Sequence, residues 1–388
     1  MRATFTPDRD TDQVVLRLWP NGGKPASAGA HEDVANVTIN NRPVTFHATN
    51  PTTVFVDSGA LAPGVAVTLN LSFVLRLPGL SDDRLSRSGN TVRLGTWLPL
   101  LAWEPIGYGG VGGVWNLEPP TSTNAEASTS VASDFDVHLA TAGLAALATG
   151  VEQEPGHWIA TAVPDWAASI GDFTIVNGES AGVPIVVGVE KSMSDPPLAY
   201  LSKVKASLAE LARRYGAYPY PRLTLALTPG MKGGIEYPGH IMQGPNTNAR
   251  TTPHEVAHQW FYSLVGNNQG RDPWLDEGLA TWAEALVNGT YASFRSRPIP
   301  ADGRGHLGEP MTFWDGHRSS YYRSVYVQGL QALAALNVGT AAVDCALARY
   351  VAANAYRVGT PAALTAALAT VAPDAAAVLA RYGAQRVT

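Results

Sequence analysis

Residues 254–282 read HEVAHQWFYSLVGNNQGRDPWLDEGLATW, and this stretch decides the fold. Its first residue, His254, is followed four residues later by His258, so on a helix both imidazoles lie on one face and can reach one Zn²⁺. Glu277, nineteen residues after His258, supplies a carboxylate. Two histidines and one carboxylate are a catalytic zinc set that leaves the fourth position for water. Glu255, beside the first histidine, is placed to take a proton from that water.

Other interpretations of these residues are open. A five-residue motif can occur by chance, and a zinc site can be structural. Structural sites are usually closed by four protein ligands, and no cysteine partner is available because Cys345 is the only cysteine. Residues 252–255, TPHE, also resemble a helix-capping box with proline in the first turn. A glutamate held in a cap could not act as base, so either the helix begins earlier or the resemblance to a cap is accidental.

The stretch resembles the gluzincin zinc aminopeptidases, the family that includes aminopeptidase N and the leukotriene epoxide hydrolase. That family has HExxH, eighteen residues and then Glu in a W-L-(N/D)-E-G segment, which is WLDEG at 274–278 here. Residues 233–238, GGIEYP, resemble its G-x-M-E-N exopeptidase motif, in the GGMEYP form of small bacterial members. Residues 326–329, YVQG, resemble its Y-x-K-G motif. Residues 215–221, YGAYPYP, occupy the place of its F-G-x-Y-P-Y-P segment, which leads into the substrate-edge strand.

The resemblance implies roles for residues outside the zinc motif. Tyr326 matches the tyrosine that donates a hydrogen bond to the tetrahedral oxyanion, and Tyr321 is a weaker candidate for the same contact. Glu236 matches the glutamate that binds the free α-amino group of the substrate, so that cleavage is counted from the N-terminus. Gly233 and Gly234 would let a substrate backbone lie close against a strand edge.

The chain also departs from the family pattern. Many members carry a Q-x-E from the β-domain that shares the substrate amine, and residues 94–100, LGTWLPL, contain none. Ile235 replaces the usual methionine and Tyr237 the usual asparagine. The segment after Glu277 is too short for the large C-terminal helical domain of bigger members. We therefore expect a compact bacterial form with a more open cleft.

Composition narrows the class of protein. The chain has 388 residues, of which 45% are hydrophobic and 15% charged, and these fractions are typical of a folded soluble protein. A net charge of −5 argues against partners such as nucleic acid or an anionic membrane surface. No apolar run reaches eighteen residues, and the N-terminus has no apolar signal segment. We expect no membrane insertion and a cytoplasmic protein as written, or an exported one if a signal precedes it. Cys345, in an alanine-rich stretch, is expected in the core.

The two halves of the sequence have different patterns. Residues 1–176 contain short β-rich runs between Gly, Pro, Asn and Ser clusters, with long loops expected over 105–133. The second half predicts strands at 183–189 and 223–227, a loop over 290–318, and helices at 198–215, 252–265, 274–287, 322–337, 340–355, 361–370 and 373–383. The fold class is α+β. The resemblance implies a saddle-like β-domain over 1–176, truncated at its start, and a thermolysin-like, mainly helical catalytic domain over 177–388.

We therefore predict a zinc metallopeptidase with one Zn²⁺ per chain that removes N-terminal residues from peptides with a free N-terminus. Three alternatives stay open. The first is an endopeptidase with an open cleft, and the second is an epoxide hydrolase or cyclase-type enzyme on the same scaffold. The third is a non-catalytic binding module, which is disfavoured because base, ligands and tyrosine are all present.

Overall fold

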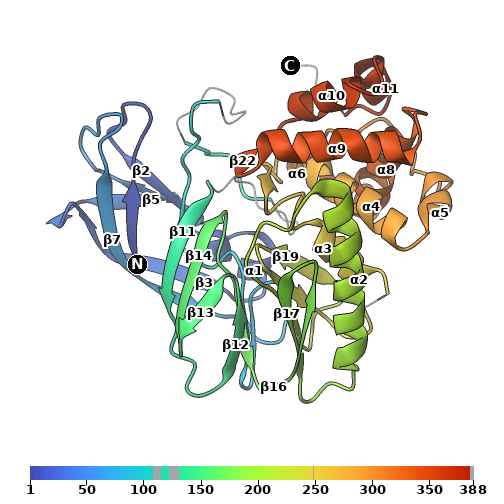
Figure 1. Ribbon diagram of the computed structural model, residues 1–388. Helices are drawn as coiled ribbons and strands as arrows, with labels where there is room; N and C mark the ends of the chain where they lie inside the picture. The colour runs from blue at the N-terminus through green and yellow to red at the C-terminus, as the bar shows by residue number, and fades with distance from the viewer. Residues whose placement is uncertain (108–114, 122–130, 248, 385–388) are drawn as a thin grey trace.

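The computed structural model describes residues 1–107, 115–121, 131–247 and 249–384. Figure 1 shows the sheets of the first half on the left, and the helices of the second half on the right and at the top. The predicted fold class, α+β with a β-rich first half and a helical second half, is confirmed. The loops expected over 105–133 lie partly outside the described residues.

Two antiparallel sheets enclose the first core. Their strand orders are β1-β7-β3-β4 and β10-β2-β6-β5. Their strands are β1 (Arg2–Phe5), β2 (Val14–Arg17), β3 (His31–Ile39), β4 (Arg42–Pro43), β5 (Phe46–Asn50), β6 (Thr53–Val56), β7 (Val67–Arg76) and β10 (Leu100–Leu101). Alternating side chains of β7 are buried, as in a sheet that packs on one face. Trp103 and Trp115 pack edge to face in this core, with ring centroids 4.8 Å apart. The connection between β2 and β3 carries two short helices, η1 (Trp19–Asn21) and α1 (Gly23–Ser27).

Two further antiparallel sheets lie beside the second half. Their strand orders are β11-β14-β13 and β12-β15-β9-β8. Their strands are β8 (Ser86–Ser88), β9 (Thr91–Leu94), β11 (Ser133–His138), β12 (Ala145–Ala148), β13 (Val151–Glu154), β14 (His157–Val163) and β15 (Ala168–Gly171). Trp158 of β14 is fully buried in the same core as the helices that follow.

A mixed five-stranded sheet, of order β16-β17-β18-β20-β19, supports the second half. Its strands are β16 (Phe173–Ser180), β17 (Val183–Glu190), β18 (Leu223–Leu227), β19 (Gly234–Tyr237) and β20 (His240–Gln243). β18 pairs in parallel with β17 and β20, and β19 forms the edge. The YGAYPYP segment therefore leads into a central strand, and the edge strand is the one that carries GGIEYP. β16 spans the domain boundary predicted at residue 176 and pairs with β17 along its length, so that boundary stays a prediction.

Helices cover the sheet and complete the fold. α2 (Pro197–Tyr215) buries Leu201, Val204, Leu208 and Leu211, which recur at helical spacing, and packs on β16, β17 and α3. The remaining elements are α3 (Thr251–Ala257), β21 (Val265–Gly266), α4 (Trp274–Val287), α5 (Tyr291–Arg295), α6 (Met311–Trp314), α7 (Arg318–Tyr322), the π-helical η2 (Arg323–Val327), α8 (Gln328–Ala334), α9 (Thr340–Asn354), β22 (Arg357–Val358), α10 (Pro361–Ala369) and α11 (Ala375–Arg381).

Four local predictions were wrong. The helix expected over 252–265 ends at Ala257, because the amides of Gln259 and Trp260 bond to the third residue back, those of 263–265 bond to the fifth, and β21 then pairs with β22. The helix expected over 322–337 begins at Arg318 and contains the π-helical turn η2, and the loop expected over 290–318 contains α5 and α6. Cys345 lies on the exposed side of α9, not in the core.

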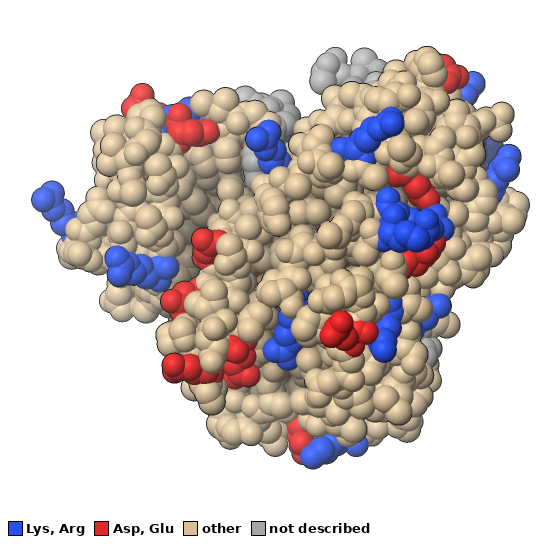
Figure 2. Space-filling view, in the orientation of Figure 1, with Lys and Arg blue, Asp and Glu red and all other residues tan. Residues whose placement is uncertain are grey.

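The surface carries charges of both signs. Figure 2 shows Lys, Arg, Asp and Glu side chains scattered over one face, separated by uncharged residues. Within the described residues, no helix is both long and apolar enough to cross a bilayer.

Candidate active site

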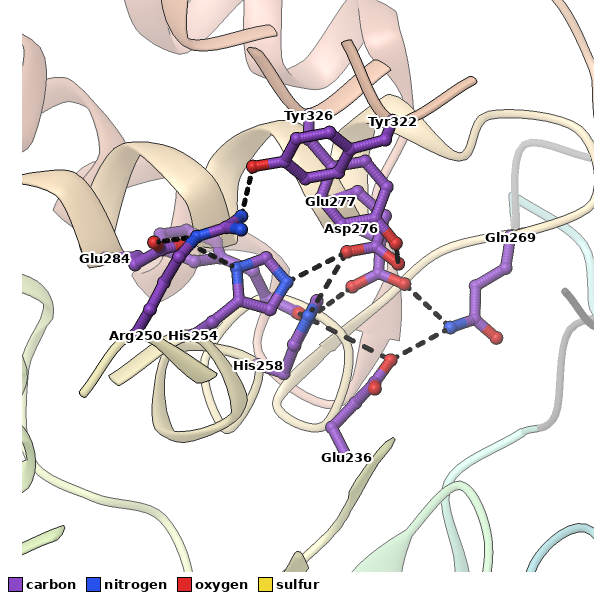
Figure 3. A network of polar contacts seen from close by, with 11 residues as sticks. Glu236, Arg250, His254, His258, Gln269, Asp276, Glu277, Glu284, Tyr322 and Tyr326 are labelled. Atoms are coloured by element: carbon purple, nitrogen blue, oxygen red, sulfur yellow. Dashed lines mark hydrogen bonds and ion pairs between the residues drawn. The ribbon is translucent and has the colours of Figure 1, made fainter. Parts of the chain in front are cut away.

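Helices α3 and α4 bring the three predicted metal ligands together. His254 Nε2 lies 3.1 Å and His258 Nε2 3.5 Å from the same oxygen, Oε2 of Glu277. Their candidate ligand atoms all lie within 4.8 Å of one another. The two imidazole rings meet edge to face, as Figure 3 shows, so that both Nε2 atoms point at the Glu277 carboxylate.

The opposite nitrogen of each imidazole contacts a second carboxylate. His254 Nδ1 is 3.1 Å from Glu284 Oε2, and His258 Nδ1 is 2.6 Å from Asp276 Oδ1. Carboxylates and backbone carbonyls in these positions fix the ring orientation of metal-binding histidines and leave Nε2 for the metal. His258 Nδ1 also makes a hydrogen bond of 3.0 Å with the backbone carbonyl oxygen of Phe261. Sequence reasoning missed Glu284. Its signal was the spacing from Glu277, because seven residues on a helix return to nearly the same face.

The electrostatics of the site fit a dication. Burial lowers the pKa of His254, but hydrogen bonds to Glu277 and Glu284 outweigh it and raise the pKa to about 10. Burial also opposes protonation of His258, yet nearby carboxylates raise its pKa well above the usual value. A metal ion would take the place of the protons that the carboxylates otherwise hold on these imidazoles. Two imidazole nitrogens and one carboxylate oxygen are a donor set that suits Zn²⁺.

Glu255 lies against the edge strand β19. A Cβ on Gly234 would come within 2.6 Å of Glu255 Oε1, so only glycine at 234 leaves room for this carboxylate. A Cβ on Gly233 would meet none of the described atoms within 4 Å, which leaves that side of the strand open to the cavity. Glu255 Oε2 is buried and has no hydrogen-bond partner among the described residues. Burial raises the pKa of Glu255 to about 7, in the range useful for a general base.

The resemblance of TPHE to a capping box is accidental. α3 begins at Thr251, one residue before the expected cap, and Arg250 at the N-cap makes no side-chain capping bond. The Thr252 hydroxyl donates instead to Gln243 Oε1, at 3.1 Å. The Glu255 carboxylate is therefore left for the cavity.

Tyr326 reaches the metal ligands from the π-helical turn η2. Its hydroxyl donates to Glu277 Oε1 at 2.5 Å, and its ring stacks on His254 with centroids 5.6 Å apart. π-helical turns inside helices are frequent at functional sites. Tyr321 packs edge to face against Tyr326, at 5.7 Å between centroids, and is not among the described residues that line the cavity. Of these two tyrosines, Tyr326 faces the site.

Two glycines set the distance between Glu277 and Tyr326. Gly278, directly after Glu277, faces Gly329, which follows Tyr326 by three residues. A Cβ built on Gly329 would lie 2.6 Å from the Cα of Gly278. The backbones of α4 and α8 therefore approach more closely than any side chain between them would allow.

Glu236 lies on β19, at the other end of the site. Its Oε1 is 4.0 Å from His258 Nδ1, and Gln269 Nε2 lies 3.4 Å from the same oxygen. Gln269 Nε2 also donates to Asp276 Oδ2, at 2.7 Å. Sequence reasoning missed Gln269, which belongs to a loop without a recognisable motif.

The residues at 94–100 lie away from the cavity. The Thr96 hydroxyl is 3.2 Å from the Tyr237 hydroxyl, and a side chain at Gly95 would collide with the Tyr237 ring. Neither this stretch nor Tyr237 is among the described lining residues. The cavity has a volume of about 190 Å³ and is lined by Gly233, Gly234, Glu236, Arg250, Thr251, His254, Glu255, His258, Glu277, Glu284 and Tyr326.

A second group of ligand-type side chains lies on the sheet β11-β14-β13. His138 and His157 are cross-strand partners whose rings stack with centroids 4.2 Å apart. Asp136 Oδ1 is 2.9 Å from His157 Nε2 and 3.8 Å from His138 Nε2. These residues are more exposed than the buried triad, so they form a weaker candidate for a resident metal.

Sequence comparisons place this site among peptidases. Residues 237–302 match the peptidase family M1 domain. Aminopeptidase N of Acetobacter pasteurianus is 28% identical over 130 residues, which are 29% of this chain and 37% of that protein. Aminopeptidase 2 of Candida albicans is 30% identical over 135 residues, which are 29% of this chain and 14% of that protein. Leukotriene A-4 hydrolase of Xenopus laevis is 24% identical over 136 residues. These matches cover 22% of the hydrolase and well under half of each relative.

Solved structures match over the whole chain. A mutant M1 zinc metallopeptidase from Deinococcus radiodurans, bound to a Tyr-Ser-Ala substrate, gives a TM-score of 0.69 at 20% identity, over 100% of this chain and 90% of that one. The M1 zinc metallopeptidase from the same organism gives 0.67 at 22% identity, over 100% and 89%. At such identities the likeness shows the fold alone. The matched domain, the sequence relatives and the shared fold together support the gluzincin aminopeptidases of peptidase family M1 as the family of this chain.

Proposed function

We propose that this protein is a zinc-dependent aminopeptidase with one Zn²⁺ per chain. The observation that carries the proposal is one cavity that joins a three-ligand site, a buried carboxylate and a tyrosine hydroxyl to a glutamate on a strand edge. His254, His258 and Glu277 would hold the metal. When bound, Zn²⁺ would polarise the scissile carbonyl and acidify a water molecule.

The remaining groups have separate tasks in the proposed reaction. Glu255 takes the proton from the attacking water and hands it to the leaving amine, for which its unpartnered oxygen and raised pKa are suited. Tyr326 exchanges its hydrogen bond to Glu277 for one to the oxyanion that develops on the carbonyl. β19 is the edge strand of its sheet, with Gly233 open to the cavity, and an extended peptide can lie along it.

Glu236 would fix the position of the substrate ammonium. Its side chain is 13% exposed at the end of the cavity, and its Oε1 lies 3.4 Å from Gln269 Nε2 and 4.0 Å from His258 Nδ1. Burial raises the pKa of Glu236 to about 8, and an ammonium beside it would favour the ionised form. Gln269 supplies an amide beside Glu236 although the chain lacks the Q-x-E motif at 94–100.

A pair of peptides tests the proposal. One sequence is presented with a free N-terminus and with an acetylated one, and products are followed by mass spectrometry. An aminopeptidase cleaves only the peptide with a free N-terminus, one residue at a time. Glu236→Ala should reduce the difference in kcat/KM between the free and the acetylated peptide. Equal internal cleavage of both peptides would establish an endopeptidase instead. Absence of cleavage by the zinc-loaded protein would favour the epoxide-type or non-catalytic alternatives.

Metal content tests the ligand set. Wild-type protein should copurify with one tightly bound zinc, and Glu277→Ala should lose it. Because the exposed Asp136, His138 and His157 group offers ligands as well, the measurement is repeated in a His157→Ala background. Full zinc occupancy of Glu277→Ala in that background would contradict the assignment of Glu277.

A further inference from the structure

The charges around the cavity form two poles. Four of its lining residues are glutamates, and Arg250 is the single lysine or arginine among those described. Glu236 lies beside His258 at one end. Arg250 lies at the other end, where its Nε is 2.7 Å from Glu284 Oε1, next to His254. Figure 3 shows the two histidines between Arg250 and Glu236.

Several contacts hold the Arg250 side chain in place and still leave N–H donors without a partner among the described residues. Its Nη2 contacts the Tyr322 hydroxyl, and its guanidinium lies 4.9 Å from the Tyr322 ring and 5.5 Å from the Phe294 ring. Nη1 makes no hydrogen bond to the described residues, and 49% of the side chain is exposed. A guanidinium has five N–H donors in a rigid plane that matches a carboxylate. An arginine fixed by Glu284, with donors left over at the wall of a cavity, is therefore pre-oriented for a further carboxylate.

The two poles suit a small zwitterion. In the proposed function the substrate ammonium lies at Glu236 and the scissile carbonyl lies between His254 and His258. The residue that leaves is then on the Arg250 side. In a dipeptide this residue carries the α-carboxylate. A volume of about 190 Å³ is below the roughly 300–1,000 Å³ usual for drug-sized ligands, so the cavity suits a substrate of this size.

We infer that Arg250 forms a carboxylate-binding subsite and that the preferred substrates are peptides whose leaving residue bears a carboxylate, free dipeptides above all. The inference rests on the proposed function, which fixes the direction of the substrate. The carboxylate can be the α-carboxyl group of a dipeptide or the side chain of an acidic second residue. Arg250 positions the leaving residue and takes no part in proton transfer.

Three alanyl substrates separate these sources: Ala-Ala, Ala-Ala amide and Ala-Glu amide. For the zinc-loaded wild type, we expect kcat/KM for Ala-Ala to exceed that for Ala-Ala amide roughly 10- to 100-fold. This factor corresponds to the usual free-energy contribution of hydrogen bonds to a charged group. Arg250→Gln should bring this ratio close to one. Ala-Glu amide cleaved as well as Ala-Ala would show that a side-chain carboxylate serves equally, and slower cleavage would assign the subsite to the α-carboxylate.

A neighbouring arginine provides the matched control. Arg297 lies 4.5 Å from the same Phe294 ring but is not among the described lining residues, so Arg297→Gln should keep the wild-type ratio. Calorimetry gives a readout without turnover. Glu255→Gln should bind Ala-Ala more tightly than its amide, and a second change, Arg250→Gln, should remove the difference. If Arg250→Gln does not fold, Arg250→Lys keeps the charge and should retain only part of the preference.

The possible failures are distinguishable. Equal wild-type rates on Ala-Ala and its amide would overturn the inference and leave the aminopeptidase intact. A loss in Arg250→Gln that is the same for acid and amide would also overturn it, because Arg250 would then only support Glu284. Failure of the zinc-loaded wild type to cleave any of the three substrates would overturn the proposed function, and the inference with it.

Discussion

Gly329→Ala tests whether the close approach of α4 and α8 positions Tyr326. The new Cβ would lie 2.6 Å from the Cα of Gly278, where carbon atoms in contact normally stand about 3.5–4.0 Å apart. Both atoms at this contact belong to the backbone or are bonded to it, so the helices must separate by about 1 Å. Overpacking of this kind lowers the free energy of unfolding by about 1–3 kcal/mol.

The same separation of the helices should also displace Tyr326 and lower the catalytic rate. Gly278 follows Glu277, and Tyr326 lies one helical turn before Gly329, so the 2.5 Å hydrogen bond between Glu277 and Tyr326 lengthens. A misplacement of about 1 Å can lower a rate roughly 10²-fold. Urea unfolding, zinc content and kcat on a free-amine peptide are measured on one preparation. We expect lower stability, retained zinc and a reduced kcat.

Two glycine variants calibrate the result. In Gly278→Ala the new Cβ would lie 3.2 Å from the Cα of Gly329, so the effects should be smaller than those of Gly329→Ala. In Gly79→Ala the Cβ would meet none of the described atoms within 4 Å, and stability and kcat should not change. A Gly329→Ala protein that loses stability but keeps its kcat would refute the link between helix spacing and Tyr326. Unchanged stability would refute the packing itself.

Four other substitutions test single groups. Glu255→Gln should keep zinc and lose roughly 10²–10⁴-fold in kcat, as expected for loss of a general base, and a wild-type rate would exclude that role. Tyr326→Phe should lower kcat about 10²–10³-fold with little change in KM, while Tyr321→Phe does less, and the reverse order would mean that Tyr321 is the donor. Glu32 is buried, neither of its oxygens has a hydrogen-bond partner among the described residues, and burial raises its pKa to about 9. The folded protein then holds a proton that the unfolded chain releases, so the free energy of unfolding should fall by up to about 1.4 kcal/mol per unit between pH 5 and 9. Glu32→Gln should flatten this slope in urea titrations, and an unchanged slope would show that Glu32 is ionised in the fold.

Elements with a strong local pattern were predictable from the sequence. The predicted ranges 223–227 and 274–287 coincide with β18 and α4, whose residues are buried in every position or on a broad face. The end of α3 was not predictable, because Val265 and Gly266 pair with residues more than ninety positions later in the chain. A local pattern cannot contain a partner at that distance. The same holds for Cys345, whose exposure depends on which side of α9 meets α2 and α10.

The residues of the site also fall into those that the sequence predicts and those that it does not. His254, His258 and Glu277 were predictable because their spacing alone places them together, and Glu284 was within reach of the same reasoning on α4. Arg250 and Gln269 were not, since each acts through a contact with a carboxylate on another element. Their roles depend on the folded geometry.

The arrangement of acids explains why the metal site needs so many of them. Glu284 and Asp276 contact the Nδ1 atoms, whereas Glu277 contacts both Nε2 atoms. Glu255 has a free buried oxygen and Glu236 lies at the far end, so neither is required to orient an imidazole. So many buried carboxylates repel one another unless a cation lies among them. Without a metal, protons on the two histidines supply that positive charge, and a dication would displace them. Metal binding and protonation of the two histidines therefore compete, because each supplies the positive charge that these carboxylates require.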